Sequence, residues 1–228
     1  MNKTKIITLS LVLVLVLMGT AFAWWTQSTT ISNQINTGSL KIELEKTKDI
    51  LGNEAKPKFY FSNHNEITGI LDDALIRSTY KASTQFNFPT SDTVNFVATN
   101  MFPGSKVAYS FAVKNTGTVP VKIEDVELLG DGLDPKVLED IIISFKFVYK
   151  SGNIPLPIIS PEPITGTYNE IAGLISETLK NVVLLPEDTI ELDVDNGFVI
   201  EIPEDWESET QDKTIDITLK FNYKQANK

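Results

Sequence analysis

The chain contains no cysteine and only one histidine, His64, among its 228 residues. Without cysteine, no disulfide can stabilise the fold and no thiolate can act as a nucleophile or a zinc ligand. Catalytic zinc needs three protein ligands, often two histidines on one helix, whereas His64 lies alone between Asn63 and Asn65. We therefore expect no metal site of this kind and a fold that is stabilised by its core.

Other catalytic arrangements are also missing. A Ser-His-Asp triad would have to use His64, and no Gly-x-Ser-x-Gly turn precedes a predicted helix. The pair Asp72-Asp73 has the residue type of a glycosidase site, but carboxylate clusters on an acidic protein are usually solvated. The sequence therefore predicts that the protein is not an enzyme and has no catalytic or cofactor-binding residues.

Two acidic turns bear on calcium. Residues 193–197 (DVDNG) and 131–134 (DGLD) resemble pieces of calcium loops, but neither has the full ligand spacing of an EF-hand. Asn196-Gly197 is equally typical of a hairpin turn. Weak calcium binding is thus the one cofactor alternative that the sequence leaves open.

Basic residues are fewer than acidic ones, 20 against 30, which gives a formal net charge of −10. A surface of this sign repels the phosphates of nucleic acids and anionic lipids. We therefore expect no nucleic-acid partner.

The first 23 residues have the layout of a cleavable export signal. Lys3 and Lys5 form a basic start, residues 6–19 are apolar, and Ala21 and Ala23 are the small residues that signal peptidase recognises. The apolar run is shorter than the roughly 20 residues that a transmembrane helix needs. The sequence therefore predicts cleavage between Ala23 and Trp24 and a secreted, extracellular or cell-surface protein.

Most of the remaining chain alternates apolar and polar residues with a period of two, the pattern of half-buried β-strands. Turn-forming pairs such as Pro103-Gly104 separate the runs. This pattern predicts an all-β fold, a jelly-roll-like antiparallel two-sheet sandwich with one or two inserted short helices and long loops. The positions expected to be buried are Val107, Tyr109, Phe111, Phe145, Phe147, Ile200, Ile217, Leu219 and Phe221.

Four stretches depart from this alternation. Helical spacing marks residues 135–140 and 168–180. Polar residues dominate 46–92, which we interpret as a large connection across one end of the sandwich, with helical spacing at 70–76 and a short strand at 58–61. Residues 152–166 contain four prolines, which predicts an exposed or edge segment.

A series of short motifs runs along the chain. They are Ala21-Phe22-Ala23, then residues 37–42 (TGSLKI), 100–105 (NMFPGS), 114–121 (KNTGTVPV), 185–188 (LPED) and 223–225 (YKQ). Each is a strand-turn-strand signature of moderate specificity, so the resemblance depends mainly on the order in which the motifs occur. In that order they resemble the TasA/camelysin family of exported biofilm-matrix fibre proteins.

The resemblance implies a jelly-roll subunit that a signal peptidase trims and that polymerises with copies of itself into extracellular fibres or pili. In such fibres the N-terminal strand of one subunit completes a sheet of the next, which is donor-strand complementation. The implied organisation is a signal peptide at 1–23, a donor-strand arm at 24–38 and a jelly-roll domain at 39–228. Trp24, Trp25 and Ile31 would be the apolar anchors of the arm, and other matrix or cell-surface proteins would be further partners.

Two alternatives remain. A monomeric cell-surface adhesin or ligand-binding β-sandwich would share the fold and the signal, and the proline-rich segment 152–166 could hold its site. A metallopeptidase, which the camelysin name suggests, is less favoured because the chain lacks the ligands described above.

Overall fold

The computed structural model describes residues 38–49, 51–62, 69–130, 135–152, 154–159, 162–193, 197–206 and 214–226. The sandwich belongs to a compact unit that runs from Gly38 to Lys228. Several predicted features lie outside the described residues: the signal peptide and the arm with Ala21, Ala23, Trp24, Trp25 and Ile31, the histidine His64, the turn 131–134 and residues 194–196.

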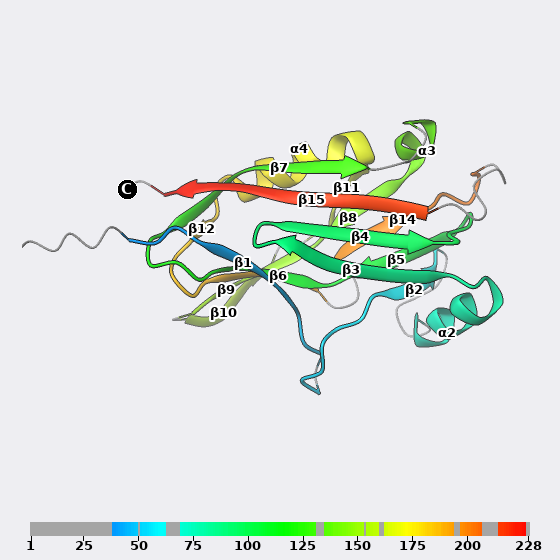
Figure 1. Cartoon of the computed structure of the whole chain (residues 1–228), viewed down its shortest axis with the longest axis horizontal. Helices are drawn as coiled ribbons and strands as arrows, with labels where there is room; N and C mark the ends of the chain where they lie inside the picture. Colours follow the sequence, from blue (N-terminus) through cyan, green and yellow to red (C-terminus); the bar gives the residue numbers. More distant parts are fainter. Residues whose placement is uncertain are drawn as a thin grey trace, which may run out of the picture. The chain divides into compact units, whose positions relative to one another are not determined.

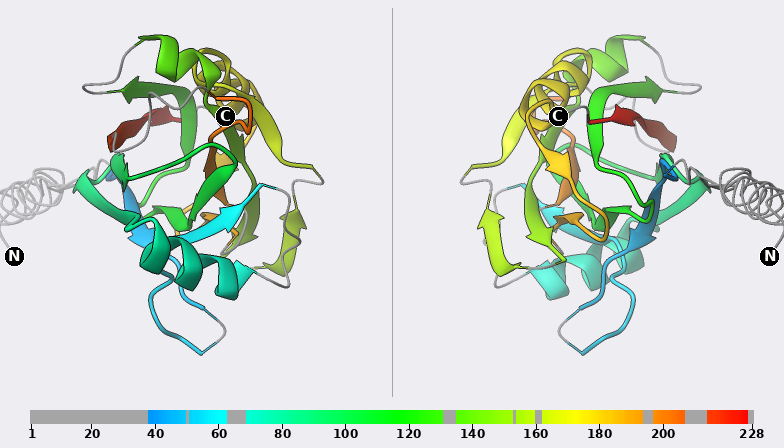
Figure 2. Two further views of the ribbon diagram at one scale, coloured as in Figure 1. Left: turned by 90° about the vertical axis from the view of Figure 1, so that its right-hand side faces the viewer. Right: turned by 90° about the vertical axis from the view of Figure 1, so that its left-hand side faces the viewer.

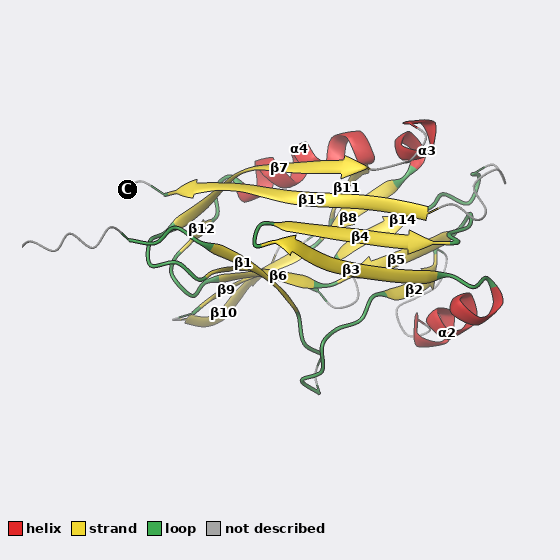
Figure 3. Cartoon of the chain, in the orientation of Figure 1, coloured by secondary structure: helices red, strands yellow, loops and turns green. Residues whose placement is uncertain are grey.

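The described strands form antiparallel sheets, which confirms the all-β prediction (Figures 1 and 3). Hydrogen bonding divides them into three sheets of five strands. The first, in spatial order, contains β1 (Ile42–Lys46), β6 (Phe111–Asn115), β13 (Thr189–Leu192), β9 (Phe147–Ser151) and β10 (Ile154–Ile159). The second contains β11 (Ile164–Thr167), β8 (Ile142–Phe145), β14 (Phe198–Glu201), β5 (Ser105–Tyr109) and β2 (Lys58–Phe61). The third contains β12 (Val183–Leu184), β7 (Val121–Gly130), β15 (Thr214–Gln225), β4 (Thr93–Thr99) and β3 (Ser83–Thr90).

The first two sheets are the two halves of one bent layer. Each strand of the first sheet continues into its neighbour in sequence in the second sheet, and the order across both sheets is the same: β1 and β2, β6 and β5, β13 and β14, β9 and β8, β10 and β11. The bend falls at single residues in two strands: Ser110 separates β5 from β6, and Lys146 separates β8 from β9. The Ser110 hydroxyl donates to the Leu192 carbonyl at 2.8 Å, and the Lys146 N–H donates to the Gly197 carbonyl at 2.7 Å. These bonds keep backbone groups satisfied at the bend. The result is a two-layer sandwich whose strands surround a common interior (Figure 2).

The nine positions predicted to be inward are all buried, which confirms the period-two interpretation. Phe96 of β4 is also among the largest fully buried side chains of the core. Its ring stacks on Phe198 with centroids 4.4 Å apart and contacts Tyr109 at 4.8 Å. The core is therefore a packed aromatic and aliphatic interior without any need of disulfides.

Three helices accompany the described strands: α2 (Gly69–Thr79), α3 (Pro135–Asp140) and α4 (Tyr168–Leu179). The last two match their predicted positions. Helix α4 starts at a capping box, in which the Glu170 carboxylate accepts from the Thr167 N–H at 3.2 Å, and it buries Ile171, Ile175 and Leu179. None of the helices among the described residues is long and apolar enough to cross a membrane.

Residues 46–92 form more than the predicted connection, although the strand expected at 58–61 and the helical stretch expected at 70–76 are present as β2 and α2. Besides β2 and α2, this stretch contains β3, an eight-residue strand that pairs with β4. Its inward residues are Thr84, Phe86 and Phe88, and polar residues between them obscured the alternation. The proline-rich segment behaves as predicted, because β10 and β11 lie at the edge of their sheets.

Candidate functional site: the open sheet edges

Sheet edges are the places where another chain can add a strand, so we considered each edge in turn. Helix α4 covers the outer side of β7, where the Val126 N–H donates to the Ser176 hydroxyl at 2.8 Å. At the opposite side of the bent layer, β10 contains Pro155 and Pro157, which remove backbone donors. Helix α2 packs against β2, α4 packs against β11, and β12 has only two residues. The two edge strands that are left, β1 and β3, each pair with a single strand among the described residues.

At its open side, β1 presents the backbone N–H and C=O groups of every second residue. The Asn115 N–H donates to the Asp188 carbonyl at 3.0 Å, so the backbone groups of Asn115 face β13 and not β1. Its register partner on β1 is Ile42. Because backbone groups alternate along an antiparallel pair, those of Ile42, Leu44 and Lys46 face away from β6.

The two open edges are neighbours through their side chains. The Lys46 ammonium at the end of β1 lies 5.6 Å from the centre of the Phe86 ring on β3. Phe86 in turn contacts the buried ring of Tyr109 at 5.9 Å, so the floor between the edges is the sandwich core. No backbone pairing joins β1 to β3 in the part of the chain that the structure describes.

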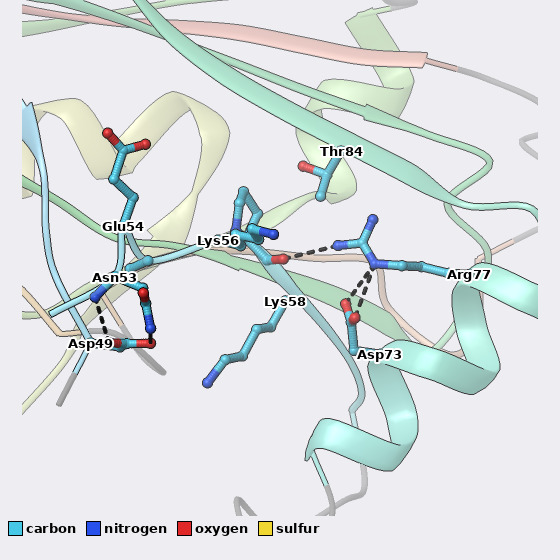
Figure 4. A pocket seen from close by; sticks show the side chains of 10 residues that line it. Asp49, Asn53, Glu54, Lys56, Lys58, Asp73, Arg77 and Thr84 are labelled. Carbon is cyan, nitrogen blue, oxygen red and sulfur yellow. Dashed lines mark hydrogen bonds and ion pairs between the residues drawn. The ribbon is translucent and has the colours of Figure 1, made fainter. Parts of the chain in front are cut away.

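A cleft of about 820 Å³ opens beside these edges, between the loop that joins β1 to β2, helix α2 and strand β3 (Figure 4). Its charged side chains are of both signs and include Lys56, Lys58 and Arg77 with Asp49, Glu54 and Asp73. Thr84 of β3 lines it and donates to the Tyr109 hydroxyl at 2.7 Å. Burial raises the pKa of Tyr109, so this hydroxyl stays protonated.

Arg77 fixes the α2 wall of the cleft. Its guanidinium donates to both Asp73 oxygens at 2.9 and 3.0 Å and to the Pro57 carbonyl at 2.9 Å (Figure 4). The same Asp73 carboxylate accepts from the Phe59 N–H, and the guanidinium lies 4.9 Å from the Phe59 ring. These bonds attach α2 to β2, so the wall is preorganised.

The opposite wall is the loop 47–55, which Asp49 holds in a tight turn. The Asp49 carboxylate accepts from the N–H groups of Leu51 and Asn53, both at 2.9 Å. The hydrogen bond from the Asn53 N–H, with smaller contributions from its neighbours, lowers the pKa of Asp49. Gly52 supplies the positive φ of 81° that this turn requires. The loop is therefore an ordered projection.

His64 lies outside the described residues, and Asp72 and Asp73 do not form an open carboxylate pair. Asp73 is paired with Arg77, and the neighbouring Asp72 is only 4% exposed. Among the described residues, no group of three His, Cys, Asp or Glu side chains could hold a metal ion. The arrangement of β1, β3 and the cleft is suited to binding an extended chain.

Sequence reasoning did not identify Lys46, Arg77 or Phe86 as parts of a site. The only available signal was the alternation of Thr84, Phe86 and Phe88, which marks a strand but not its place at an edge. Comparison of the chain with family models, with curated proteins and with solved structures gives no match. The family resemblance therefore stays a prediction from the motifs alone.

Proposed function

We propose that the protein is a secreted structural subunit that polymerises into extracellular fibres, with the N-terminal arm of one copy added between β1 and β3 of the next. The observation that supports this most is the pair of neighbouring edges, which pair with one strand each and have the core as their floor. An added strand would satisfy the outward backbone groups of Ile42, Leu44 and Lys46 and place alternate side chains against Phe86.

The predicted arm is long enough for this role. Residues 24–38 span up to about 50 Å when extended. The arm leaves the sandwich beside the turn between β6 and β7, where the Ser39 N–H donates to the Thr118 hydroxyl at 2.8 Å and the Thr118 N–H donates back to the Ser39 carbonyl. A Cβ at Gly38 would lie 2.1 Å from a Val119 methyl, so a larger residue here would require the Val119 side chain to move.

The energetics assign the decisive role to the anchors. About ten backbone hydrogen bonds would contribute roughly 0.5–1.5 kcal/mol each, and ordering the arm costs roughly 1–2 kcal/mol per residue. For ten ordered residues the cost, roughly 10–20 kcal/mol, exceeds the roughly 5–15 kcal/mol from the hydrogen bonds. Burial of Trp24, Trp25 and Ile31, worth roughly 1.5–3 kcal/mol for each side chain, would then decide whether fibres form.

Removal of the arm tests the proposal. We expect purified protein that begins at Trp24 to form fibres in electron micrographs, and protein that begins at Ser39 to remain a folded monomer. The variant Trp24→Ser with Trp25→Ser should require at least a hundredfold higher concentration, since two large apolar anchors are lost. Normal fibres from the protein that begins at Ser39 would eliminate the proposal. A protein that begins at Trp24 and stays monomeric would favour the ligand-binding alternative.

A further inference from the structure

Exposed apolar side chains gather at two places on the sandwich. The large apolar residues that are more than a third exposed include Leu40, Val183 and Leu185 in one region and Leu75 and Tyr80 in another. Isolated exposed apolar residues are normal, whereas groups of them mark contact surfaces.

The first group, the aliphatic end, surrounds the turn between β6 and β7. Leu40 lies between Ser39 and Lys41, which bond to Thr118 and Gly117 of this turn. Strand β12 brings Val183 opposite Lys122, next to the same turn, and Leu185 follows it directly. The arm leaves the sandwich at this end.

The second group, the aromatic end, adjoins a hollow of about 420 Å³ that is lined by Phe61, Tyr80, Phe102, Pro103, Gly104 and Glu204. The Tyr80 ring, 45% exposed, stacks on Phe102 with centroids 4.0 Å apart. Leu75 belongs to α2, which lies at the same end (Figure 1).

Strand β15 of the third sheet runs from the aromatic end to the aliphatic end, so the two ends lie at opposite ends of this sheet. Its first residue, Thr214, is paired with Thr99, just before the segment that contains Phe102, and its last, Gln225, is paired with Val121. Twelve strand residues separate the two ends by about 36 Å. In Figure 1, β12 and the start of β1 lie at one end and α2 lies at the other.

We propose that the aliphatic end of one copy packs into the aromatic hollow of the next, as a second subunit contact in addition to the arm. This inference rests on the proposed fibre function, because the copy that receives the arm must lie near the end from which the arm leaves. Two different surfaces that meet head to tail form an open filament and not a closed dimer. Lys122, which lies opposite Val183 at the aliphatic end, also complements the charge of Glu204 at the hollow.

The absence of cysteine allows a direct test. Tyr80→Cys and Leu185→Cys are combined in the protein that begins at Trp24, fibres are grown, and a short bis-maleimide is added. We expect a ladder of covalent multimers on a denaturing gel, since each copy joins two others. Each single variant should stay monomeric on the gel. The matched control combines Leu185→Cys with Leu174→Cys, which places the second thiol on an exposed leucine of helix α4, and should give no ladder.

The outcomes separate this contact from the proposed function. Fibres of the double variant without a ladder would overturn the end-to-end contact and leave the arm mechanism intact. Cross-linked dimers of the Leu185→Cys single variant would also overturn the contact, because they indicate a symmetric contact between two aliphatic ends. Absence of fibres from the unaltered protein would overturn both. Independently, Leu185→Asp should raise the critical concentration about tenfold or more, equivalent to about 1.4 kcal/mol, while Leu174→Asp, on helix α4, should not change it.

Discussion

Replacement of Asp188 by alanine should lower the free energy of unfolding by about 3–5 kcal/mol, because each buried donor left without a partner costs about 1–3 kcal/mol. This is a large part of the roughly 5–15 kcal/mol that stabilises a typical domain. Asp188 is completely buried. Its carboxylate accepts from the N–H groups of Gly152 and Leu185, both at 2.9 Å, from the Ser151 hydroxyl at 3.0 Å and from the Tyr149 hydroxyl. Alanine would leave all these donors without this acceptor.

Urea unfolding of the protein that begins at Ser39 would measure this effect, with Trp206 as the only tryptophan left to report by fluorescence. Glu191→Ala, on strand β13 just after Asp188, removes a half-buried partner of the exposed Lys150 and should cost at most about 1 kcal/mol. Equal losses from the two variants would show that the Asp188 contacts do not stabilise the fold.

The same carboxylate makes stability depend on pH. Burial alone would raise its pKa, but the hydrogen bonds from Tyr149, Gly152, Leu185 and Ser151 outweigh this, so the pKa of Asp188 is lowered. Burial and the adjacent Asp188 raise the pKa of Tyr149 to about 12, so the tyrosine remains a donor. A lowered pKa adds stability above the ordinary aspartate value, about 3.9, which is lost as the pH falls through the folded value. Asp188→Asn should therefore show a weaker loss of stability between pH 5 and 3.

Phe86→Glu should prevent a copy from binding the arm of another copy, while its own arm can still insert into a neighbour. Phe86→Glu places a charge on the apolar floor of the open edges and opposite Lys46, so an inserted apolar strand would bury an ion pair at high cost. We expect at least a hundredfold weaker polymerisation, about 2.7 kcal/mol. Asn87→Glu, on the exposed face of the same strand, is the matched control and should polymerise normally.

Mixing two variants tests whether Phe86→Glu affects only the binding of the arm. Phe86→Glu protein can donate but not receive, and protein that begins at Ser39 can receive but not donate. Each alone should be monomeric, whereas an equimolar mixture should contain heterodimers and nothing larger by analytical ultracentrifugation. A mixture that stays monomeric while both proteins are folded would contradict reception between β1 and β3.

The fold was predictable because the alternation of apolar residues is local. Val107, Phe145 and Leu219 each lie in a run that shows its inward face without knowledge of its neighbours. The open edges were not predictable, since the place of β3 at an edge depends on which strands pair over long separations. Asp188 was predicted only as part of a turn motif, because nothing in Leu185-Pro186-Glu187-Asp188 indicates that Tyr149 of β9 and Gly152, which follows β9, donate to its carboxylate.

Hydrogen exchange on individual amides tests the central claim most directly. The protein that begins at Ser39 would be mixed with a peptide of residues 24–38, and exchange would be followed by NMR. We predict that peptide binding slows exchange at Ile42, Leu44 and Lys46, whose N–H groups face away from β6, and leaves Glu43 and Glu45 unchanged because β6 already protects them. A peptide that binds without protecting Ile42, Leu44 and Lys46, or that fails to bind, would contradict the account.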